Sequence, residues 1–199
     1  EDAVYAEEYT IDLSELKPLA ACPHSPDNVK PVDELKKIKV DQIAIGSCTN
    51  SSYADMLKVA RMLKGKKIAD GVSLGISPGS RQVLSMLAEC GALTDMIDAG
   101  ARILECTCGP CIGMGFSPNS GGVSLRTFNR NFLVRSGTKD GQVYLVSPET
   151  AAASALTGYI TDPTTLEFVG KVEIPEQFRI NDSGFIPPLP PEEAKDAQV

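Results

Sequence analysis

The sequence predicts an α/β fold, a three-layer α/β/α domain with a largely parallel sheet. The first observation is that short β-branched runs alternate with segments whose apolar residues recur at helical spacing. The second is that Gly, Ser and Pro stand between these segments, where turns are expected. The third is that 199 residues with 42% apolar content can bury a full core. Alternation of this kind is typical of strands joined by crossover helices.

The first strand is expected at residues 40–46, a β-branched run that ends in Gly. A polar loop follows, and residues 53–64 then form a predicted helix. Its apolar side chains include Met56, Ala60 and Leu63, and Gly65 closes it.

The same pattern then repeats along the chain. Pro148 at a helix start suits the first helical position. Further strands are expected at 72–76, 102–105, 125–128 and 142–146, and further helices at 81–90, 93–98 and 148–156.

The two ends have a different composition from this central region. Residues 1–36 carry scattered prolines and polar residues and predict an extended lead-in without helix or strand. Residues 37–172 form the predicted domain, and residues 173–199 are a Pro-rich linker that we expect to lead to a further domain.

Composition excludes several classes of function. A net charge of -7 argues against a nucleic-acid partner, because phosphate contacts need clustered Lys and Arg. No apolar run reaches 18 residues, so we expect no membrane span. The acidic start of the sequence does not resemble a signal peptide, and the cysteine spacing favours a reduced, cytoplasmic setting.

The cysteines carry the main chemical signal. Cys48 follows the first predicted strand, and Cys108 and Cys111 follow the third as Cys-Gly-Pro-Cys. Loops after parallel strands emerge at the same edge of a sheet, where ligands bind. The three thiols can therefore converge on one point.

Three thiolates suit an iron-sulfur cluster with one exchangeable iron site, or a zinc ion, because both metals accept soft ligands. The Cys-x-x-Cys pair alone also permits a redox-active dithiol. A structural zinc site completed by Cys106, Cys48 or Cys90 is a further alternative. Cys90, at the end of a predicted helix, is expected to be packed rather than reactive.

The surroundings of these cysteines resemble the aconitase superfamily. The resemblance runs from about residue 11 to about residue 163. Five segments in family order carry it: Ile45-Gly46-Ser47-Cys48-Thr49-Asn50-Ser51-Ser52, Ser77-Pro78-Gly79-Ser80, Cys108-Gly109-Pro110-Cys111-Ile112-Gly113, Phe128-Asn129-Arg130-Asn131-Phe132 and Ser147-Pro148-Glu149-Thr150-Ala151.

The resemblance implies the third, iron-sulfur domain of a hydro-lyase that removes and re-adds water on a tricarboxylic or related hydroxy acid. It implies a [4Fe-4S] cluster held by the three cysteine ligands Cys48, Cys108 and Cys111, with the fourth iron free for the leaving hydroxyl. Asn129, Arg130 and Arg135 would bind substrate, since a guanidinium matches a carboxylate bidentately.

The sequence departs from the family pattern at one position. The family commonly has Gly immediately before the last of these arginines, where this chain has Val134. A different local backbone at this point would put the role of Arg135 in doubt.

The resemblance also implies that the remaining chemistry lies elsewhere. The family's acid and base groups belong to other domains of the same enzyme, including a swivelling domain, so we expect no catalytic residue and no hydratase activity in this fragment alone. The sole histidine, His24, is expected at the surface.

The residues near the cysteines also suggest a substrate. Residues 51–53 and Ile112 resemble those of aconitases more than those of the other dehydratases in the family. This resemblance implies citrate/isocitrate isomerisation through cis-aconitate, a tricarboxylic acid cycle reaction. The alternatives are a 3-isopropylmalate or homoaconitate dehydratase domain, or a non-catalytic metal-binding module.

Overall fold

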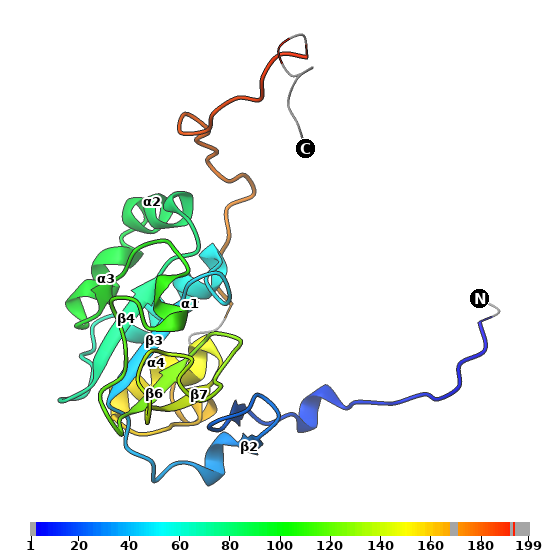
Figure 1. The fold of residues 1–199 in the computed structure, drawn as a ribbon, viewed down its shortest axis with the longest axis vertical. Helices are drawn as coiled ribbons and strands as arrows, with labels where there is room; N and C mark the ends of the chain where they lie inside the picture. Colours follow the sequence, from blue (N-terminus) through cyan, green and yellow to red (C-terminus); the bar gives the residue numbers. More distant parts are fainter. Residues whose placement is uncertain (1–2, 168–170, 192, 194–199) are drawn as a thin grey trace.

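A seven-stranded sheet forms the centre of the protein (Figure 1). The computed structural model describes residues 3–167, 171–191 and 193. The strand order is β2-β1-β7-β6-β3-β4-β5; β3 to β7 run parallel, and β1 pairs antiparallel with both β2 and β7. The strands are β1 (Leu19–Ala21), β2 (Val29–Pro31), β3 (Gln42–Gly46), β4 (Ser73–Ser77), β5 (Arg102–Ile103), β6 (Val123–Arg126) and β7 (Gln142–Leu145).

Helices connect these strands and begin where the sequence supplies caps. Ser52 and Asp55 form a reciprocal capping box at the start of α1, and Pro148 occupies the first turn of α4. The α-helices are α1 (Tyr53–Leu63), α2 (Arg81–Glu89), α3 (Ala92–Asp98) and α4 (Pro148–Thr157), and the 3-10 helices are η1 (Leu13–Glu15), η2 (Val32–Glu34), η3 (Gly109–Ile112) and η4 (Pro163–Thr165).

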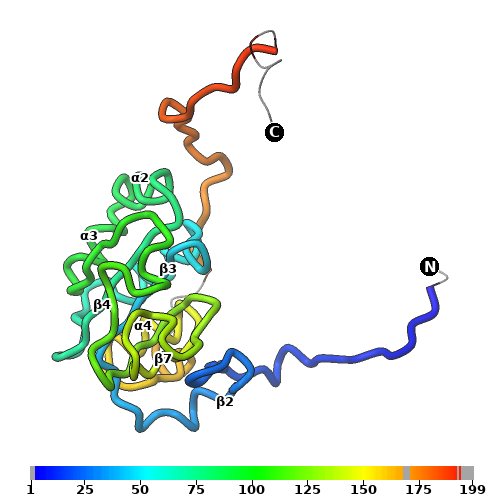
Figure 2. Tube along the Cα trace, in the orientation of Figure 1, coloured from blue at the N-terminus to red at the C-terminus, as the bar shows by residue number. Residues whose placement is uncertain are grey.

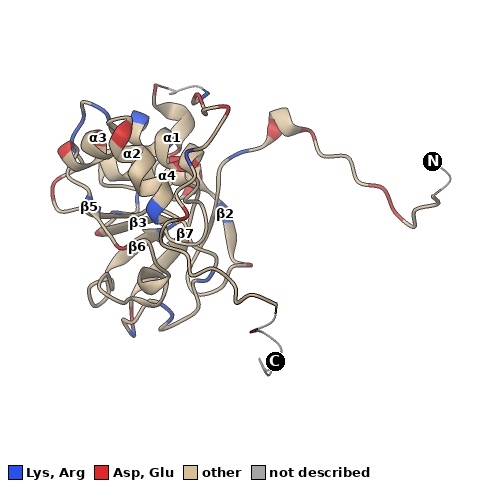
Figure 3. Cartoon of the chain, turned by 90° about the horizontal axis from the view of Figure 1, so that it is seen from above, with Lys and Arg blue, Asp and Glu red and all other residues tan. Residues whose placement is uncertain are grey.

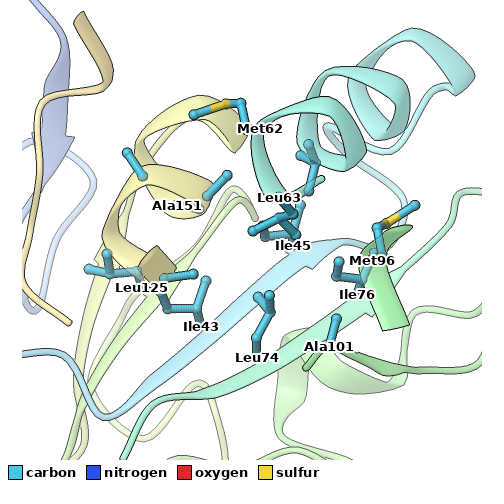
Figure 4. Packing of buried hydrophobic residues seen from close by; sticks show 14 of the residues in the cluster. Ile43, Ile45, Met62, Leu63, Leu74, Ile76, Met96, Ala101, Leu125 and Ala151 are labelled. Carbon is cyan, nitrogen blue, oxygen red and sulfur yellow. The ribbon is translucent and has the colours of Figure 1, made fainter. Parts of the chain in front are cut away.

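The two faces of the sheet are covered differently. The α-helices gather over one face, with α1 packed against α2, α3 and α4 (Figures 1 and 3). Side chains of alternating strand residues, such as Ile43, Ile45 and Leu125, point into the core between sheet and helices (Figure 4). Ala44 has the opposite orientation and packs with Phe116 and Phe128 in a second cluster. The third layer therefore consists of the 104–116 segment with η3.

The predicted α/β class and largely parallel sheet are confirmed. Each predicted strand and helix appears within a few residues of its expected bounds. No described helix combines the length and apolar character needed to cross a membrane.

The expectation that residues 1–36 hold no helix or strand was wrong. β1 and β2 form a hairpin whose first strand meets Leu145 of β7 through Ala21. Both strands are three residues long, β1 is Leu-Ala-Ala and β2 ends in Pro31, so their local propensity is weak; pairing with the edge of the sheet stabilises them.

The segment after η4 contacts the helical layer. Phe178 meets the Tyr53 ring edge-on with centroids 6.0 Å apart, and Arg179 pairs with Glu89 of α2. Figure 2 shows that the N-terminal and C-terminal segments both extend away from the sheet. The contacts of Phe178 and Arg179 hold the start of the C-terminal segment against the helices. The linker boundary at residue 173 remains a prediction.

Candidate functional site

The first loop of the site leaves the carboxyl end of β3. Gly46 has φ +94°, and a Cβ there would lie 2.0 Å from the carbonyl oxygen of Ser77 on β4. Only glycine fits this approach. Ser47 follows with φ +93°, and its N–H donates to the same carbonyl at 2.7 Å. The chain therefore turns sharply and presents Cys48 at the sheet edge.

Thr127, the residue directly after β6, holds this turn in place. The Thr127 hydroxyl accepts from the Gly46 N–H at 2.8 Å, and the Thr127 carbonyl accepts from Asn50 Nδ2 at 2.7 Å. The Asn50 amide thus stabilises the loop beside Cys48. The loop is ordered by buried hydrogen bonds before any ligand is considered.

The second loop carries Cys108 immediately before η3 and Cys111 within it. Pro110 lies in the first turn of this short helix, and Gly113 ends it with φ +88°. A Cβ on Gly113 would lie 2.1 Å from the Ser136 carbonyl oxygen. This loop therefore packs closely against the 131–137 segment, which brings Cys111 next to Arg135, one of the predicted substrate-binding arginines.

The structure brings the three predicted thiols together. The Sγ atoms of Cys108 and Cys111 are 3.2 Å apart, well beyond the length of a disulfide bond, and all six cysteines are free. The side chains of Cys48 and Cys108 are close enough for each to perturb the other's pKa. Two loops about 60 residues apart in the sequence thus meet at one edge of the sheet.

The thiols differ in how readily they ionise. A hydrogen bond from the Thr49 hydroxyl, at 3.5 Å, is the main cause that lowers the pKa of Cys48. The pKa of Cys108 is raised, first by its hydrogen bond with Cys111 and then by the charges of Cys111 and Cys48. Such mutual effects are expected where several thiols share one place, because each thiolate disfavours the next.

Within the described residues, no three Cys, His, Asp or Glu side chains surround a point closely enough for one metal ion. An iron-sulfur cluster does not require its cysteine ligands to surround a single ion, because each cysteine binds a different iron.

A buried cation lies beneath the second loop. Arg126, on β6, is fully buried, and its guanidinium donates to the carbonyl oxygens of Pro110 and Phe116. Burial lowers its pKa to about 10, and the neighbouring Cys111 acts in the opposite direction. Arg126 therefore stays charged near neutral pH. Free thiols beside a buried positive charge would suit a negatively charged group that binds through thiolates, such as an iron-sulfur cluster.

The predicted substrate-binding residues lie beside this edge. Arg130 is exposed and donates only to the carbonyl of its neighbour Asn129, at 2.6 Å. Arg135 is exposed too, and its Nη2 lies 3.9 Å from Cys111 Sγ. Neither arginine forms an ion pair with any described residue, so both guanidinium groups are available to an acidic ligand.

The backbone at residue 134, where this chain departs from the family pattern, has a glycine-like conformation. Val134 has φ +67°, the left-handed conformation that glycine adopts readily and a β-branched residue rarely does. The turn holds its shape through hydrogen bonds from Arg135 N to Phe132 O and from Gly137 N to Val134 O, at 2.9 and 3.0 Å. Val134 therefore occupies a backbone conformation that glycine could also adopt, and the role of Arg135 stays a prediction.

The other cysteines and the histidine differ in their surroundings. Cys22 is buried under the lead-in hairpin, and His24 is exposed as expected. The expectation that Cys90 is packed was wrong: it is exposed, because it caps the end of α2 at the surface. Cys106 is half-buried and lines a cavity of about 600 Å³ with Arg81 and Arg179.

Sequence reasoning missed Arg126 and Asn131. Asn131 is fully buried, and its Nδ2 donates to the carbonyls of Cys22 and Val143, which ties the lead-in to the sheet. A signal existed for Arg126, because a charged residue stands directly after the apolar Leu125 at the end of a largely buried strand.

Fold and site together define an α/β protein that collects free thiols from two distant loops at the ligand-binding edge of a parallel sheet. The sequence matches the aconitase family (aconitate hydratase) over residues 1–158, and the chain belongs to that family.

Three relatives share one printed name, 3-isopropylmalate dehydratase large subunit. The protein from Clostridioides difficile (strain 630) is 50% identical over 169 residues, covering 83% of this chain and 40% of the relative. Those from Clostridium botulinum (strain Alaska E43 / Type E3) and Nitratidesulfovibrio vulgaris (strain DP4) are 47% and 43% identical, each covering 82% of this chain and 39% of the relative. The chain spans about two-fifths of the length of these relatives.

These relatives favour the isopropylmalate alternative over our preference for citrate/isocitrate. Part of that preference came from residues 51–53, yet Ser51 and Tyr53 are buried. Ser51 donates to the Ser47 carbonyl, so it shapes the loop. Such residues report on loop structure rather than on substrate.

Proposed function

We propose that this chain is the cluster-bearing domain of an aconitase-family dehydratase that acts on a hydroxy acid of the 3-isopropylmalate type. The observation that carries the proposal is the convergence of Cys48 with Cys108 and Cys111 at the carboxyl edge of the sheet. Membership of the aconitase family supports it independently.

In this proposal Cys48, Cys108 and Cys111 are the ligands of a [4Fe-4S] cluster. With three thiolates the cluster supplies a Lewis-acidic iron that keeps a coordination position for substrate. The protein's part is to hold the three sulfurs in fixed relative positions, which the turn at Gly46 and the close packing at Gly113 accomplish.

Substrate recognition is assigned to the exposed groups next to the thiols. Arg130 and Arg135 provide planar, permanently charged donors for carboxylates, and Asn129 provides an amide. Arg135 lies against Cys111, so a carboxylate bound there would also lie beside the cluster.

The substrate class rests on the relatives. Their shared name points to 3-isopropylmalate, a dicarboxylate whose remaining side chain is apolar. Arginines that bind carboxylates do not distinguish it from a tricarboxylate, so we place the selecting residues outside this chain.

The acid and base groups are also placed elsewhere. The described residues offer one histidine, His24, which is exposed and lies in the lead-in segment. We propose that other domains, or a smaller partner of the kind implied by the relatives' name "large subunit", supply these groups and close the site. The Pro-rich segment after residue 173 would connect or contact such a partner.

The cluster proposal is tested by anaerobic reconstitution of the chain with iron and sulfide. We expect visible charge-transfer absorption and equal amounts of iron and labile sulfide, both lost in Cys48→Ser, Cys108→Ser and Cys111→Ser. Cys90→Ser is the matched control, because Cys90 is an exposed thiol at the end of α2 and belongs to neither loop. Full cluster content in Cys48→Ser would contradict the proposal.

The activity is tested in two steps. The chain alone should not dehydrate 3-isopropylmalate, whereas the chain assembled with the missing domains or subunit should. Turnover of citrate or isocitrate in preference to 3-isopropylmalate by that assembly would overturn the substrate assignment.

One observation favours a second candidate, a thiol-disulfide oxidoreductase. The Sγ atoms of Cys108 and Cys111 are 3.2 Å apart, close enough to form a disulfide after a small rotation. This candidate predicts disulfide reductase activity that survives Cys48→Ser, whereas the cluster should not.

A further inference from the structure

Arg126 is a charged residue in the middle of the sheet. It ends β6, which lies between β7 and β3, and it is fully buried. Leu125 packs into the core under the α-helices. Its neighbour Arg126 therefore points to the opposite face of the sheet, where the second loop, with Cys108 and Cys111, lies. A cation at the centre of a parallel sheet requires a specific explanation, because such positions are normally apolar.

The guanidinium uses its donors to hold the cysteine loop. Nη1 donates to Pro110 O, between the two cysteines, and Nη2 donates to Phe116 O at 2.7 Å. The 110–116 stretch is thereby tied to β6 at both ends. Bonds to Gln42 Oε1 at 2.9 Å and Ser124 Oγ at 3.1 Å fix the guanidinium itself.

All of these acceptors are neutral. Arg126 forms no ion pair with any described Asp or Glu, and its other close neighbour is the ring of Phe128, with Cζ 5.5 Å from the ring centroid. An uncompensated buried charge is strongly unfavourable, so such groups are normally paired with an anion. Cys111 is adjacent to Pro110, and as a proposed cluster ligand it would bring a thiolate to this loop.

We propose that Arg126 is a positioning residue for the thiolate-bound group. Its guanidinium holds the 110–116 backbone so that Cys108 and Cys111 are presented together, and its charge balances the negative charge that the thiolates and their cluster bring to this edge. This inference rests on the proposed function, because it assigns the counter-charge of the same centre.

A charge role and a purely structural role predict different results for the reduction potential. A nearby cation favours the more negative, reduced form of a cluster, so its removal should lower the potential. Loss of hydrogen bonds alone would reduce the amount of cluster without shifting the potential of the clusters that remain.

Three variants separate these roles in the full 199-residue chain. Arg126→Gln removes the charge, and Arg126→Lys keeps the charge but loses the planar fork. Gln42→Glu places a carboxylate where the Gln42 oxygen now accepts from Nη2 of Arg126. The carboxylate balances the charge of Arg126, and the guanidinium itself is retained. Arg102→Gln is the matched control, because Arg102 also contacts this loop, through Gly115 O, but is exposed.

The test is an anaerobic redox titration of the reconstituted proteins, followed by the paramagnetic signal of the reduced cluster. We expect Arg126→Gln and Gln42→Glu to lower the potential by at least 59 mV, a tenfold change in the ratio of reduced to oxidised cluster. Arg126→Lys and Arg102→Gln should stay near the wild-type value. If Arg126→Gln does not fold, as judged by circular dichroism, Gln42→Glu carries the test.

Two results would overturn the inference while leaving the proposed function intact. One is a wild-type potential in both charge-neutralising variants, and the other is an equal fall in Arg126→Lys. A wild-type chain that assembles no cluster would overturn the proposed function and this inference together.

Discussion

Substitution of Gly46 by alanine should be among the most disruptive single-methyl changes in this protein. The added Cβ would lie 2.0 Å from Ser77 O, and φ at this residue is +94°. The positive φ costs about 1–2 kcal/mol for an L-residue. Displacing Ser77 would also break the 2.7 Å bond from Ser47 N, worth about 0.5–1.5 kcal/mol, and overpacking adds about 1–3 kcal/mol. We expect a total loss of about 3 kcal/mol or more.

Gly65→Ala provides a matched control for this change. Gly65 has φ +69°, but nothing lies within 4 Å of its Cβ position. It should lose only the conformational part, about 1 kcal/mol. Urea unfolding followed by circular dichroism measures both variants. Equal losses in Gly46→Ala and Gly65→Ala would refute the reasoning that close approach of β3 to β4 fixes the turn before Cys48.

Two other perturbations have defined outcomes. Val134→Gly should stabilise the protein by about 1 kcal/mol, because glycine adopts the left-handed conformation without the strain of a β-branched residue, less some cost from the freer unfolded chain. Val134→Ala should bring no comparable gain in thermal unfolding. Equal stability of the two variants would contradict the strain assigned to Val134. Burial raises the pKa of Tyr53 to about 12, above the usual value near 10, so the unfolded chain loses this proton first and stability should fall between pH 10 and 12. Tyr53→Phe should show a smaller fall over that range in denaturant titrations, and an identical decline in both proteins would refute this assignment.

Sequence patterns predicted the elements that carry their own local signals. The run ending at Gly46 and the helix after Ser52 are examples, since periodicity, caps and turn residues agree at each. The hairpin of β1 and β2 could not be predicted in this way. Its strands are three residues long, and its stability comes from pairing with β7, which lies more than a hundred residues later.

The candidate site was partly predictable for a similar reason. Cys48, Cys108 and Cys111 lie in loops after parallel strands, so topology alone predicts that they meet. The partners of Arg126 are backbone carbonyls of residues 110 and 116, and no side-chain pattern in the sequence marks a carbonyl as an acceptor. The left-handed backbone at Val134 was equally invisible, because valine rarely adopts it.

The contact between Phe178 and Tyr53 shows the limit of compositional reasoning at the C-terminal end. Proline content predicted a linker from residue 173, yet Phe178 and Arg179 rest on α1 and α2. Isolated aromatic and charged residues in a proline-rich stretch give no sign of which surface they will meet.

The central claim is that residues 48, 108 and 111 contribute their sulfurs to one inorganic centre. Thiol alkylation read out residue by residue by mass spectrometry, before and after anaerobic loading with iron and sulfide, tests it most directly. Cys48, Cys108 and Cys90 are all exposed and should react in the unloaded chain. Loading should protect Cys48 and Cys108 together while Cys90 continues to react, and a loaded protein in which Cys48 still reacts at its original rate would contradict the account.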